Sequence, residues 1–173
     1  MLFLKPFRCQ ICDDTYLGDI VPDRCPFCGV LGKYLVNAAE WINYGAIEMS
    51  GESYNFCREA LRLELKNTAF YECCVENADN YFTQAIFRRL EKQEDEHVEL
   101  ICNMMGIKEP DLPDESCHGS DEENFQEAHR REKEAMTFYL KVAEEAPELR
   151  VKEVFRSLAE AEGEHLKTAN LYG

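Results

Sequence analysis

Apolar and polar positions follow a helical pattern through most of the chain after residue 52. The pattern predicts four helices, over residues 53–78, 80–105, 121–146 and 147–171. Asp79, Ser120 and Pro147 are the expected helix starts, and Ser120 begins a capping box with Glu123. Gly106, which is followed by Pro110 and Pro113, is the expected stop of the second helix.

The lengths of the connections predict how these helices fold together. The links before the second and fourth helices are very short, so each of these two pairs forms an antiparallel hairpin. Residues 106–120 form the longer crossover between the hairpins. The sequence therefore predicts a mainly α protein in which residues 53–173 form a four-helix bundle.

Residues 1–36, which we call the knuckle, have a different character. They hold two Cys-x-x-Cys pairs among Pro, Asp and aromatic residues, and so short a piece cannot bury enough apolar surface to fold unaided. Two such pairs can place four thiolates around one ion, whose binding then stabilises the fold. The expected ligands are Cys9, Cys12, Cys25 and Cys28. We therefore expect a metal domain over residues 1–36 and a linker over 37–52, with zinc and iron both open as the ion.

Composition and charge narrow the classes of partner. Hydrophobic residues make up 45% of the chain and charged residues 31%, which suits a globular protein with a solvated surface. The net charge of −15 repels phosphate backbones and anionic lipids, so we expect neither a nucleic acid nor a membrane as partner. The stretch from Met1 to Arg8 has too few apolar residues for a signal peptide, and we expect a cytoplasmic protein.

The chain has nine cysteines. In a reducing compartment, cysteines serve metal binding more often than disulfide formation. Outside the two Cys-x-x-Cys pairs we expect free thiols within helices, at Cys57, Cys73, Cys74 and Cys102. Cys117 and His118 lie in the acidic crossover, which we expect to be a mobile loop.

The helical part contains an internal repeat, in which residues 59–97 align with residues 127–165. The aligned identities include Glu-Ala-x-Arg-x-Glu at 59–64 and 127–132, Phe-Tyr at 70–71 and 138–139, and Glu-x-Glu-His at 94–97 and 162–165. The bundle is therefore predicted to be a duplicated helical hairpin.

The helical period decides which of the repeated residues share a face. Glu94 and His97 are three residues apart, about 60° around a helix, and so point the same way. Each hairpin then offers one Glu from its first helix and Glu-x-x-His from its second. The six expected ligands are Glu64, Glu94, His97, Glu132, Glu162 and His165. This set fits a carboxylate-bridged dinuclear metal site inside a four-helix bundle.

The charges of this set agree with a dinuclear site. Four glutamates buried alone would be very costly, whereas two divalent irons neutralise them. Tyr71 and Tyr139 follow Glu64 and Glu132 by two helical turns and share their faces. We expect these hydroxyls to hydrogen-bond to metal-bound carboxylates across the bundle.

With both motifs placed, the chain resembles a rubrerythrin, of the reverse type in which the four-cysteine segment comes first. The resemblance covers nearly the whole chain, and Cys25-Pro-Phe-Cys28-Gly29 follows the family's knuckle pattern. It implies a rubredoxin-like iron in the four-cysteine site and two non-haem irons in a ferritin-like bundle, with zinc open in either site as isolated. It also implies reduction of hydrogen peroxide in oxidative-stress defence. The implied electron donor is an NAD(P)H-dependent reductase or a rubredoxin.

Two positions depart from the family's pattern. Asp13 stands where Gly is usual after the first Cys-x-x-Cys, so we expect a positive φ and slight strain there. Ala135 stands where many members carry an additional glutamate, three residues after the lone Glu of the third helix. Glu127 and Glu134 lie about 140° and 160° around the helix from Glu132, so they do not replace it.

Three functions therefore stay open. The leading one is a peroxide reductase, the second an oxygen-reducing oxidase or ferroxidase, and the third an iron-binding protein without turnover. A one-electron donor on the same chain favours iron over zinc in the knuckle, because zinc has no accessible redox change. Since electron transfer falls steeply with distance and we expect the knuckle to lie far from its own bundle's centre, we expect a twofold homodimer that pairs each knuckle with the other bundle.

Overall fold

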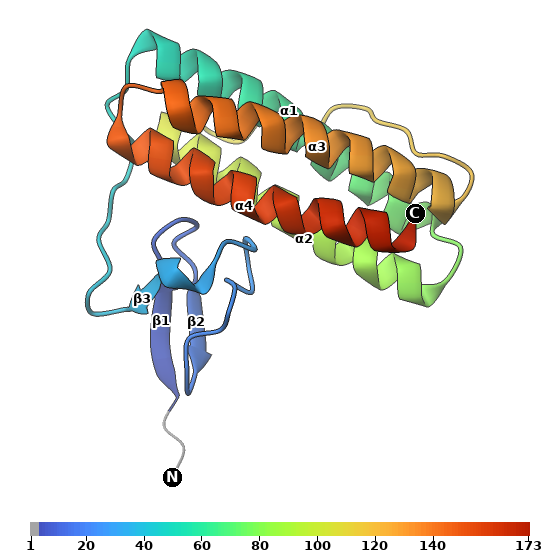
Figure 1. The fold of residues 1–173 in the computed structure, drawn as a ribbon, viewed down its shortest axis with the longest axis horizontal. Helices are drawn as coiled ribbons and strands as arrows, with labels where there is room; N and C mark the ends of the chain where they lie inside the picture. The colour runs from blue at the N-terminus through green and yellow to red at the C-terminus, as the bar shows by residue number, and fades with distance from the viewer. Residues whose placement is uncertain (1–3) are drawn as a thin grey trace.

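The computed structural model of the protein describes residues 4–173, so residues 1–3 of the predicted knuckle, which also begin the stretch tested for a signal peptide, lie outside the described residues. A small sheet is followed by four long helices (Figure 1). The helices are α1 (Gly51–Asn77), α2 (Tyr81–Met105), α3 (Asp121–Glu145) and α4 (Leu149–Tyr172). α1 packs against α2 and α3 against α4, which confirms the mainly α class and the two predicted hairpins.

Caps explain where the helices begin and end. Ser120 caps α3 as predicted, and Gly106 ends α2 in the left-handed conformation. Asp79 is wrong as the start of α2, because Asn80 accepts two backbone N–H groups of the first turn while the Asp79 carboxylate caps the first N–H of α3 instead. Pro147 is also wrong, since the N-cap of α4 is Glu148.

The knuckle is built on an antiparallel sheet of three short strands. They are β1 (Lys5–Cys9), β2 (Thr15–Gly18) and β3 (Leu35–Asn37), in the order β2-β1-β3. Cys9 ends β1 and Cys12 lies in the turn that follows it. Cys25 and Cys28 lie in a second turn, which a bridge between Arg24 and Leu31 closes. Residues 38–50 then lead to α1, close to the predicted linker.

Buried apolar side chains fill both ends of the bundle. At one end, Ile11 and Val30 of the knuckle belong to the same buried cluster as Ile101 of α2. At the other end, Phe70 and Phe87 lie in a second cluster. Along every helix the buried Glu and His residues fall between these two clusters. The core thus leaves one polar chamber in the middle of the bundle.

The knuckle lies against the α2 and α4 side of the bundle (Figure 1). Arg89 of α2 donates to the carbonyl oxygens of Pro26 and Phe27. Arg24 pairs with Glu164 of α4 at 2.9 Å. These contacts fix the second Cys-x-x-Cys turn on the middle of the bundle, next to the polar chamber.

The structure corrects the expectation for Cys73. It forms a disulfide with Cys117, which joins α1 to the crossover. The crossover folds back along α1, so that the Cys117 N–H donates to Cys73 Sγ at 3.1 Å. The predicted free thiol at Cys73 is therefore wrong, whereas Cys57, Cys74 and Cys102 are free and buried as expected.

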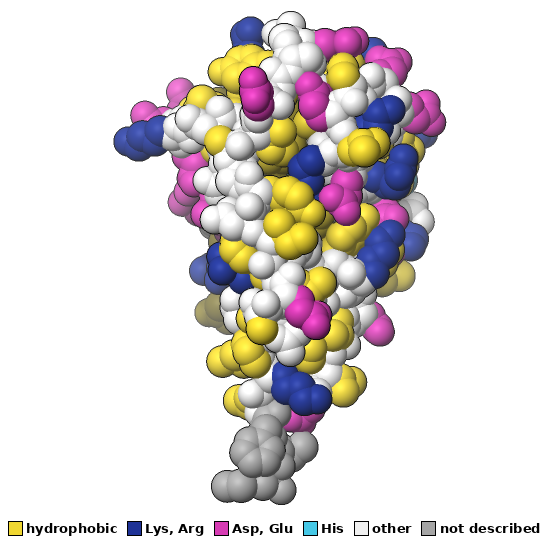
Figure 2. All heavy atoms as spheres, turned by 90° about the vertical axis from the view of Figure 1, so that its left-hand side faces the viewer, with side chains coloured by type: hydrophobic (Ala, Val, Ile, Leu, Met, Phe, Trp, Pro, Cys, Tyr) yellow, Lys and Arg dark blue, Asp and Glu magenta, His cyan; other side chains and the backbone are white. Residues whose placement is uncertain are grey.

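The surface mixes charges of both signs. On the face drawn in Figure 2, Lys and Arg side chains lie among Asp and Glu side chains and among apolar ones. The excess of negative charge is thus not gathered into a single patch on this face. Within residues 4–173, none of the helices has the length and apolar character needed to cross a membrane.

Candidate metal centres

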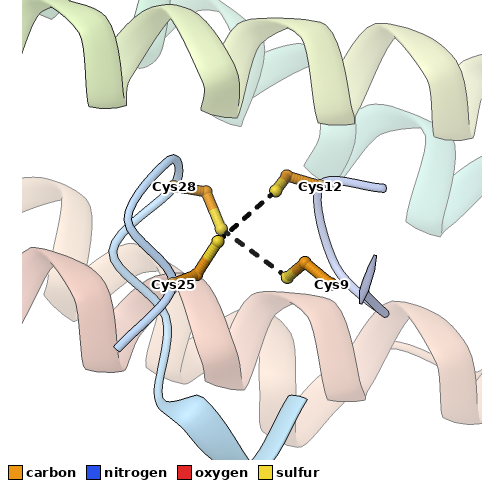
Figure 3. A group of neighbouring side chains, drawn as sticks. All are labelled: Cys9, Cys12, Cys25 and Cys28. Atoms are coloured by element: carbon orange, nitrogen blue, oxygen red, sulfur yellow. Dashed lines mark hydrogen bonds between the residues drawn. The ribbon is translucent and has the colours of Figure 1, made fainter. Parts of the chain in front are cut away.

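The four predicted cysteines converge in the knuckle (Figure 3). Cys9 and Cys12 approach from one turn, and Cys25 and Cys28 from the other. Cys9 Sγ lies 4.0 Å from Cys28 Sγ, and Cys12 Sγ lies 3.8 Å from Cys25 Sγ. A tetrahedral ion with metal–sulfur bonds of about 2.3 Å needs sulfurs about 3.8 Å apart. The four thiols therefore fit a single tetrahedral ion.

Both turns use left-handed residues just after a Cys-x-x-Cys pair. Asp13 has φ 68° and Gly29 has φ 78°. The positive φ predicted for Asp13 is confirmed, and Asp is among the residues that tolerate this region. Trp41 closes the site from the linker by donating its indole N–H to the Cys9 carbonyl at 3.1 Å. The knuckle therefore holds its four sulfurs on a hydrogen-bonded frame.

All six residues predicted for the dinuclear site meet in the polar chamber, and none is more than 3% exposed. One group that could hold a metal ion comprises Glu64, Glu94, His97 and Glu162. The other comprises Glu94, Glu132, Glu162 and His165. Glu94 and Glu162 belong to both groups, so they are placed to bridge two ions. Glu64 and Glu132 are placed to hold one ion each, with one imidazole beside each ion.

The pKa values in the chamber reflect burial and crowded charge. Burial and the carboxylates of Glu132 and Glu162 raise the pKa of Glu94 well above its usual range. Burial raises the pKa of Glu132 to about 7. For Glu162, burial acts upward, but the charges of His165 and His97 outweigh it and lower the pKa. Four carboxylates are thus crowded together out of contact with water, and two divalent cations held beside neutral imidazoles would balance all four charges.

Unpartnered atoms point to the same conclusion. Buried ligand atoms without a hydrogen-bond partner include Glu64 Oε2, Glu94 Oε1, Glu132 Oε2, both carboxylate oxygens of Glu162, and the Nδ1 atoms of His97 and His165. Buried polar groups are seldom left unpaired, because each lost hydrogen bond is costly. Carboxylate oxygens and imidazole nitrogens are ligands that suit iron. The residues present therefore fit a dinuclear iron centre.

The two predicted tyrosines connect the hairpins around the chamber. Tyr71 of α1 donates its hydroxyl hydrogen to Glu132 of α3, and Tyr139 of α3 donates to Glu64 of α1. Burial and the nearby carboxylates raise the pKa of both hydroxyls well above the usual range, so both remain protonated donors. Each tyrosine thus orients a terminal carboxylate supplied by the opposite hairpin.

At the position where many family members have an additional glutamate, this chain has a buried alanine. Ala135 is fully buried, and Glu134 instead faces outward and pairs with Arg130. The repeat pairs Ala135 with Asn67 of α1, whose amide lies 3.5 Å from Glu94 Oε2. An extra carboxylate is therefore missing from both halves, as the sequence predicted for α3.

The outer nitrogens of the two histidines face different partners. His97 Nε2 donates to the Cys28 carbonyl of the knuckle at 2.8 Å. His165 Nε2 lies 3.3 Å from the side-chain amide of Gln93. The expectation that the knuckle lies far from its own bundle's centre is therefore wrong, because a single hydrogen bond joins a residue of each metal centre within one chain. This removes the distance argument for a dimer, and the homodimer itself stays a prediction.

A pocket of about 490 Å³ leads from the surface to His165. It lies between α2 and α4, beside the knuckle, with Leu90 and Ala161 among its apolar lining residues and Arg24 and Arg89 on its knuckle side. Its walls suit a small molecule, and its inner end is a ligand of the dinuclear site.

Sequence reasoning missed two side chains and one backbone carbonyl of these sites. Trp41 and Gln93 belong to no motif, and their roles depend on how the knuckle packs on the bundle. The carbonyl of Cys28 was missed because backbone acceptors leave no trace in residue identity. The disulfide partner of Cys73 was also missed, although the chain offers only four other cysteines outside the knuckle: Cys57, Cys74, Cys102 and Cys117.

Comparison with known proteins agrees with both centres. The family model described as Rubrerythrin matches residues 55–171, a range that contains all six residues of the dinuclear site. Neither the curated proteins nor the solved structures gave a match. The knuckle precedes the matched range and adds the four-cysteine site. On the family match and these two sites, the chain is a non-haem iron protein that belongs to the rubrerythrin family.

Proposed function

We propose that the protein reduces hydrogen peroxide to water at the dinuclear iron, with electrons relayed through the knuckle iron. The observation that carries this proposal is the hydrogen bond from His97 Nε2 to the Cys28 carbonyl. It places a ligand of the one-electron centre in contact with a ligand of the two-electron centre. A relay of this kind has no use in a protein that only stores iron.

A reduced dinuclear centre supplies two electrons, which together with two protons convert one peroxide into two waters. The residues of the chain hold that centre in place. Glu94 and Glu162 span the two ion positions, while Tyr71 and Tyr139 fix the terminal carboxylates. The pocket beside His165, with a volume of about 490 Å³, has room for a peroxide molecule next to a residue of the dinuclear site.

The external donor of electrons is part of the same proposal. An NAD(P)H-dependent reductase or a rubredoxin passes single electrons to the knuckle iron. In Figure 1 the strands of the knuckle project away from the bundle, so a protein partner can reach the knuckle while its cysteine turns stay docked on the helices. We further propose a cytoplasmic location and a homodimer.

A second function is favoured by one specific feature. Ala135 is fully buried, so the third helix offers no additional carboxylate for a change of ligand during turnover. The remaining six-ligand set is symmetric, as in oxidases and ferroxidases that use oxygen. We therefore keep an oxygen-reducing oxidase or ferroxidase as the alternative.

The test compares the two oxidants directly. The iron-loaded protein is reduced without oxygen and mixed rapidly with hydrogen peroxide or with dissolved oxygen, while the visible absorption of both iron centres is followed. We expect peroxide to oxidise the dinuclear centre much faster than oxygen, and the knuckle iron to follow. Equal or faster oxidation by oxygen would establish the alternative.

A matched control isolates the relay. Protein with zinc in the knuckle and iron in the bundle should react once with peroxide and then stop, because zinc passes no electrons. Sustained turnover of this zinc form at the rate of the all-iron form would show that the knuckle is structural.

A further inference from the structure

The peptide group between Cys28 and Gly29 faces the outer nitrogens of both histidines, in two different ways. Its carbonyl accepts directly from His97 Nε2 at 2.8 Å. Its N–H lies 3.1 Å from the Gln93 side-chain oxygen when that amide is turned toward it, and Gln93 in turn contacts His165 Nε2. One peptide group of the knuckle therefore contacts His97 directly and His165 through Gln93.

At His97, the contact prepares the ring for a metal ion. A carbonyl oxygen only accepts, so His97 carries a hydrogen on Nε2. Nδ1, which faces the carboxylates of Glu64 and Glu162, is then free to hold an ion. The outer hydrogen bond thus sets the proton arrangement that metal binding needs.

At His165, the contact with Gln93 disfavours the proton arrangement that metal binding needs. With the Gln93 oxygen toward His165, the Gln93 NH₂ group faces two other donors, the N–H of Gly29 and the guanidinium of Arg89. Both donors also have backbone acceptors in the knuckle, so the conflict in this orientation is the close approach of donor to donor. With the amide turned around, its oxygen accepts from Gly29 N at 3.1 Å and from Arg89 Nη2 at 3.0 Å, and its nitrogen donates to His165 Nε2 at 3.3 Å. The second orientation satisfies all three contacts, but it requires His165 Nε2 to be an acceptor.

A histidine whose Nε2 accepts must carry its hydrogen on Nδ1. At His165 that nitrogen faces Glu94 and Glu162, at 2.7 and 2.8 Å, where an ion would sit. Holding an ion at His165 therefore leaves Gln93 with donors facing donors in either orientation. His97 meets no such conflict.

We propose that Gln93 is a positioning residue that makes the two iron positions unequal: the position beside His97 fills first and holds its ion more tightly, and the position beside His165 is the exchangeable one. The proposal depends on the dinuclear site and is independent of which oxidant the protein uses. It also places the weaker position at the inner end of the pocket that opens to the surface.

The repeat shows that this device belongs to one half only. Gln93 aligns with Ala161, a buried residue whose side chain has no hydrogen-bonding group. Gly29 makes the contact with Gln93 feasible, because a Cβ on Gly29 would lie 2.6 Å from Gln93 Nε2. The sequence thus differs between the halves at the residue just before each bridging glutamate.

Crystals at partial metal occupancy test the order of filling. Metal-free protein receives one equivalent of Zn²⁺, which the thiolates take up, and then one equivalent of Co²⁺. We expect the anomalous signal of cobalt to be clearly stronger beside His97 than beside His165. Equal signals, or a stronger one beside His165, would overturn the proposal.

A single substitution tests the cause. In Gln93→Glu, a carboxylate can accept from His165 Nε2, from Gly29 N and from Arg89 together, which removes the conflict. In calorimetric Co²⁺ titrations of the zinc-filled protein, we expect the weaker step to tighten by roughly tenfold and the tighter step to stay within about twofold. The matched control is Gln126→Glu, which adds the same charge at an exposed site on α3 and should change neither step.

If Gln93→Glu leaves the weaker step unchanged, or tightens both steps alike, the role assigned to Gln93 is wrong. Because two ions in one site repel each other, unequal steps in the unaltered protein do not by themselves decide the question. The occupancy measurement needs no variant, so it stands even if Gln93→Glu folds poorly. Neither measurement involves peroxide, and both therefore remain valid if the proposed peroxide activity fails.

Discussion

The α1–α2 and α3–α4 hairpins hold the same ligands in different surroundings. Each supplies a terminal glutamate, a bridging glutamate, a histidine and a tyrosine, at matching places in the repeat. Around these groups the halves diverge, with Asn67 opposite Ala135 and Gln93 opposite Ala161. Only the first hairpin is joined to the crossover by a disulfide. The comparison teaches that the duplication preserves what touches the metal, while the outer contacts make each half distinct.

Removing a bridging carboxylate should have the largest effect on metal binding, and the loss of affinity should be the same for the two hairpins. Glu94→Ala and Glu162→Ala each remove a group shared by both ion positions. We expect affinity for the dinuclear metals to fall by more than about a hundredfold, beyond the loss that follows removal of an outer partner. Metal analysis and metal titration measure this, with Glu134→Ala at the surface as the control. A large effect in one half only would contradict the shared bridging role.

The next largest effect should come from removing the disulfide, which only the first hairpin has, and it should appear in the free energy of unfolding. It closes a loop of 44 residues between Cys73 and Cys117. Cys117→Ser should lower the free energy of unfolding by about 2–4 kcal/mol in oxidised protein, because the unfolded chain becomes less constrained. Thermal unfolding with and without a reductant measures this, and the reductant should bring the unaltered protein to the level of the variant. If the reductant leaves the melting temperature unchanged, the bond does not form in solution.

The tyrosines test whether the halves are equivalent around their terminal carboxylates. Tyr71→Phe and Tyr139→Phe each remove one hydroxyl donor to a buried glutamate and leave the ring packing in place. We expect each variant to weaken metal binding by roughly tenfold. Calorimetric titration compares the two variants directly. If only Tyr71→Phe weakened metal binding, the two tyrosine contacts would be similar in geometry but unequal in their contribution to metal affinity.

The smallest effect should come from a pair of surface glutamates that the repeat aligns. Glu127 is 20% exposed and contacts both Arg130 and Arg131, which hold its pKa down to about 2. Glu59 is 45% exposed and pairs with Arg62 alone. We expect Glu127→Gln to lower the free energy of unfolding at pH 7 by about 1 kcal/mol and Glu59→Gln to change it very little.

The pH dependence of this difference follows from the lowered pKa. The stabilising contribution of Glu127 is present above the ordinary carboxyl pKa and is lost as the pH falls toward about 2. The gap between Glu127→Gln and the unaltered protein should therefore close on acidification. Chemical unfolding over a pH series measures it, and a gap that widens in acid would reverse the assigned sign.

The sequence by itself determined which residues are the candidate ligands of both centres. Glu94 and His97 share a face wherever a helix forms, because the helical period is local and nearly fixed. Cys9 and Cys12 likewise meet through one tight turn. The repeat then predicts that the second hairpin supplies the same ligands as the first. The Cys-x-x-Cys and Glu-x-x-His groups could be predicted because their members lie within a few residues of each other, and Glu64 and Glu132 because the repeat aligns them.

Only the tertiary structure decided how the two centres and the crossover come together. The contact of Cys28 with His97, the placement of Gln93 and the bond between Cys73 and Cys117 all join segments that are far apart in sequence. Residues 38–50 carry no pattern that fixes where the knuckle docks. Such contacts depend on the packing of whole elements and on backbone groups common to every residue, so neither spacing nor composition could reveal them.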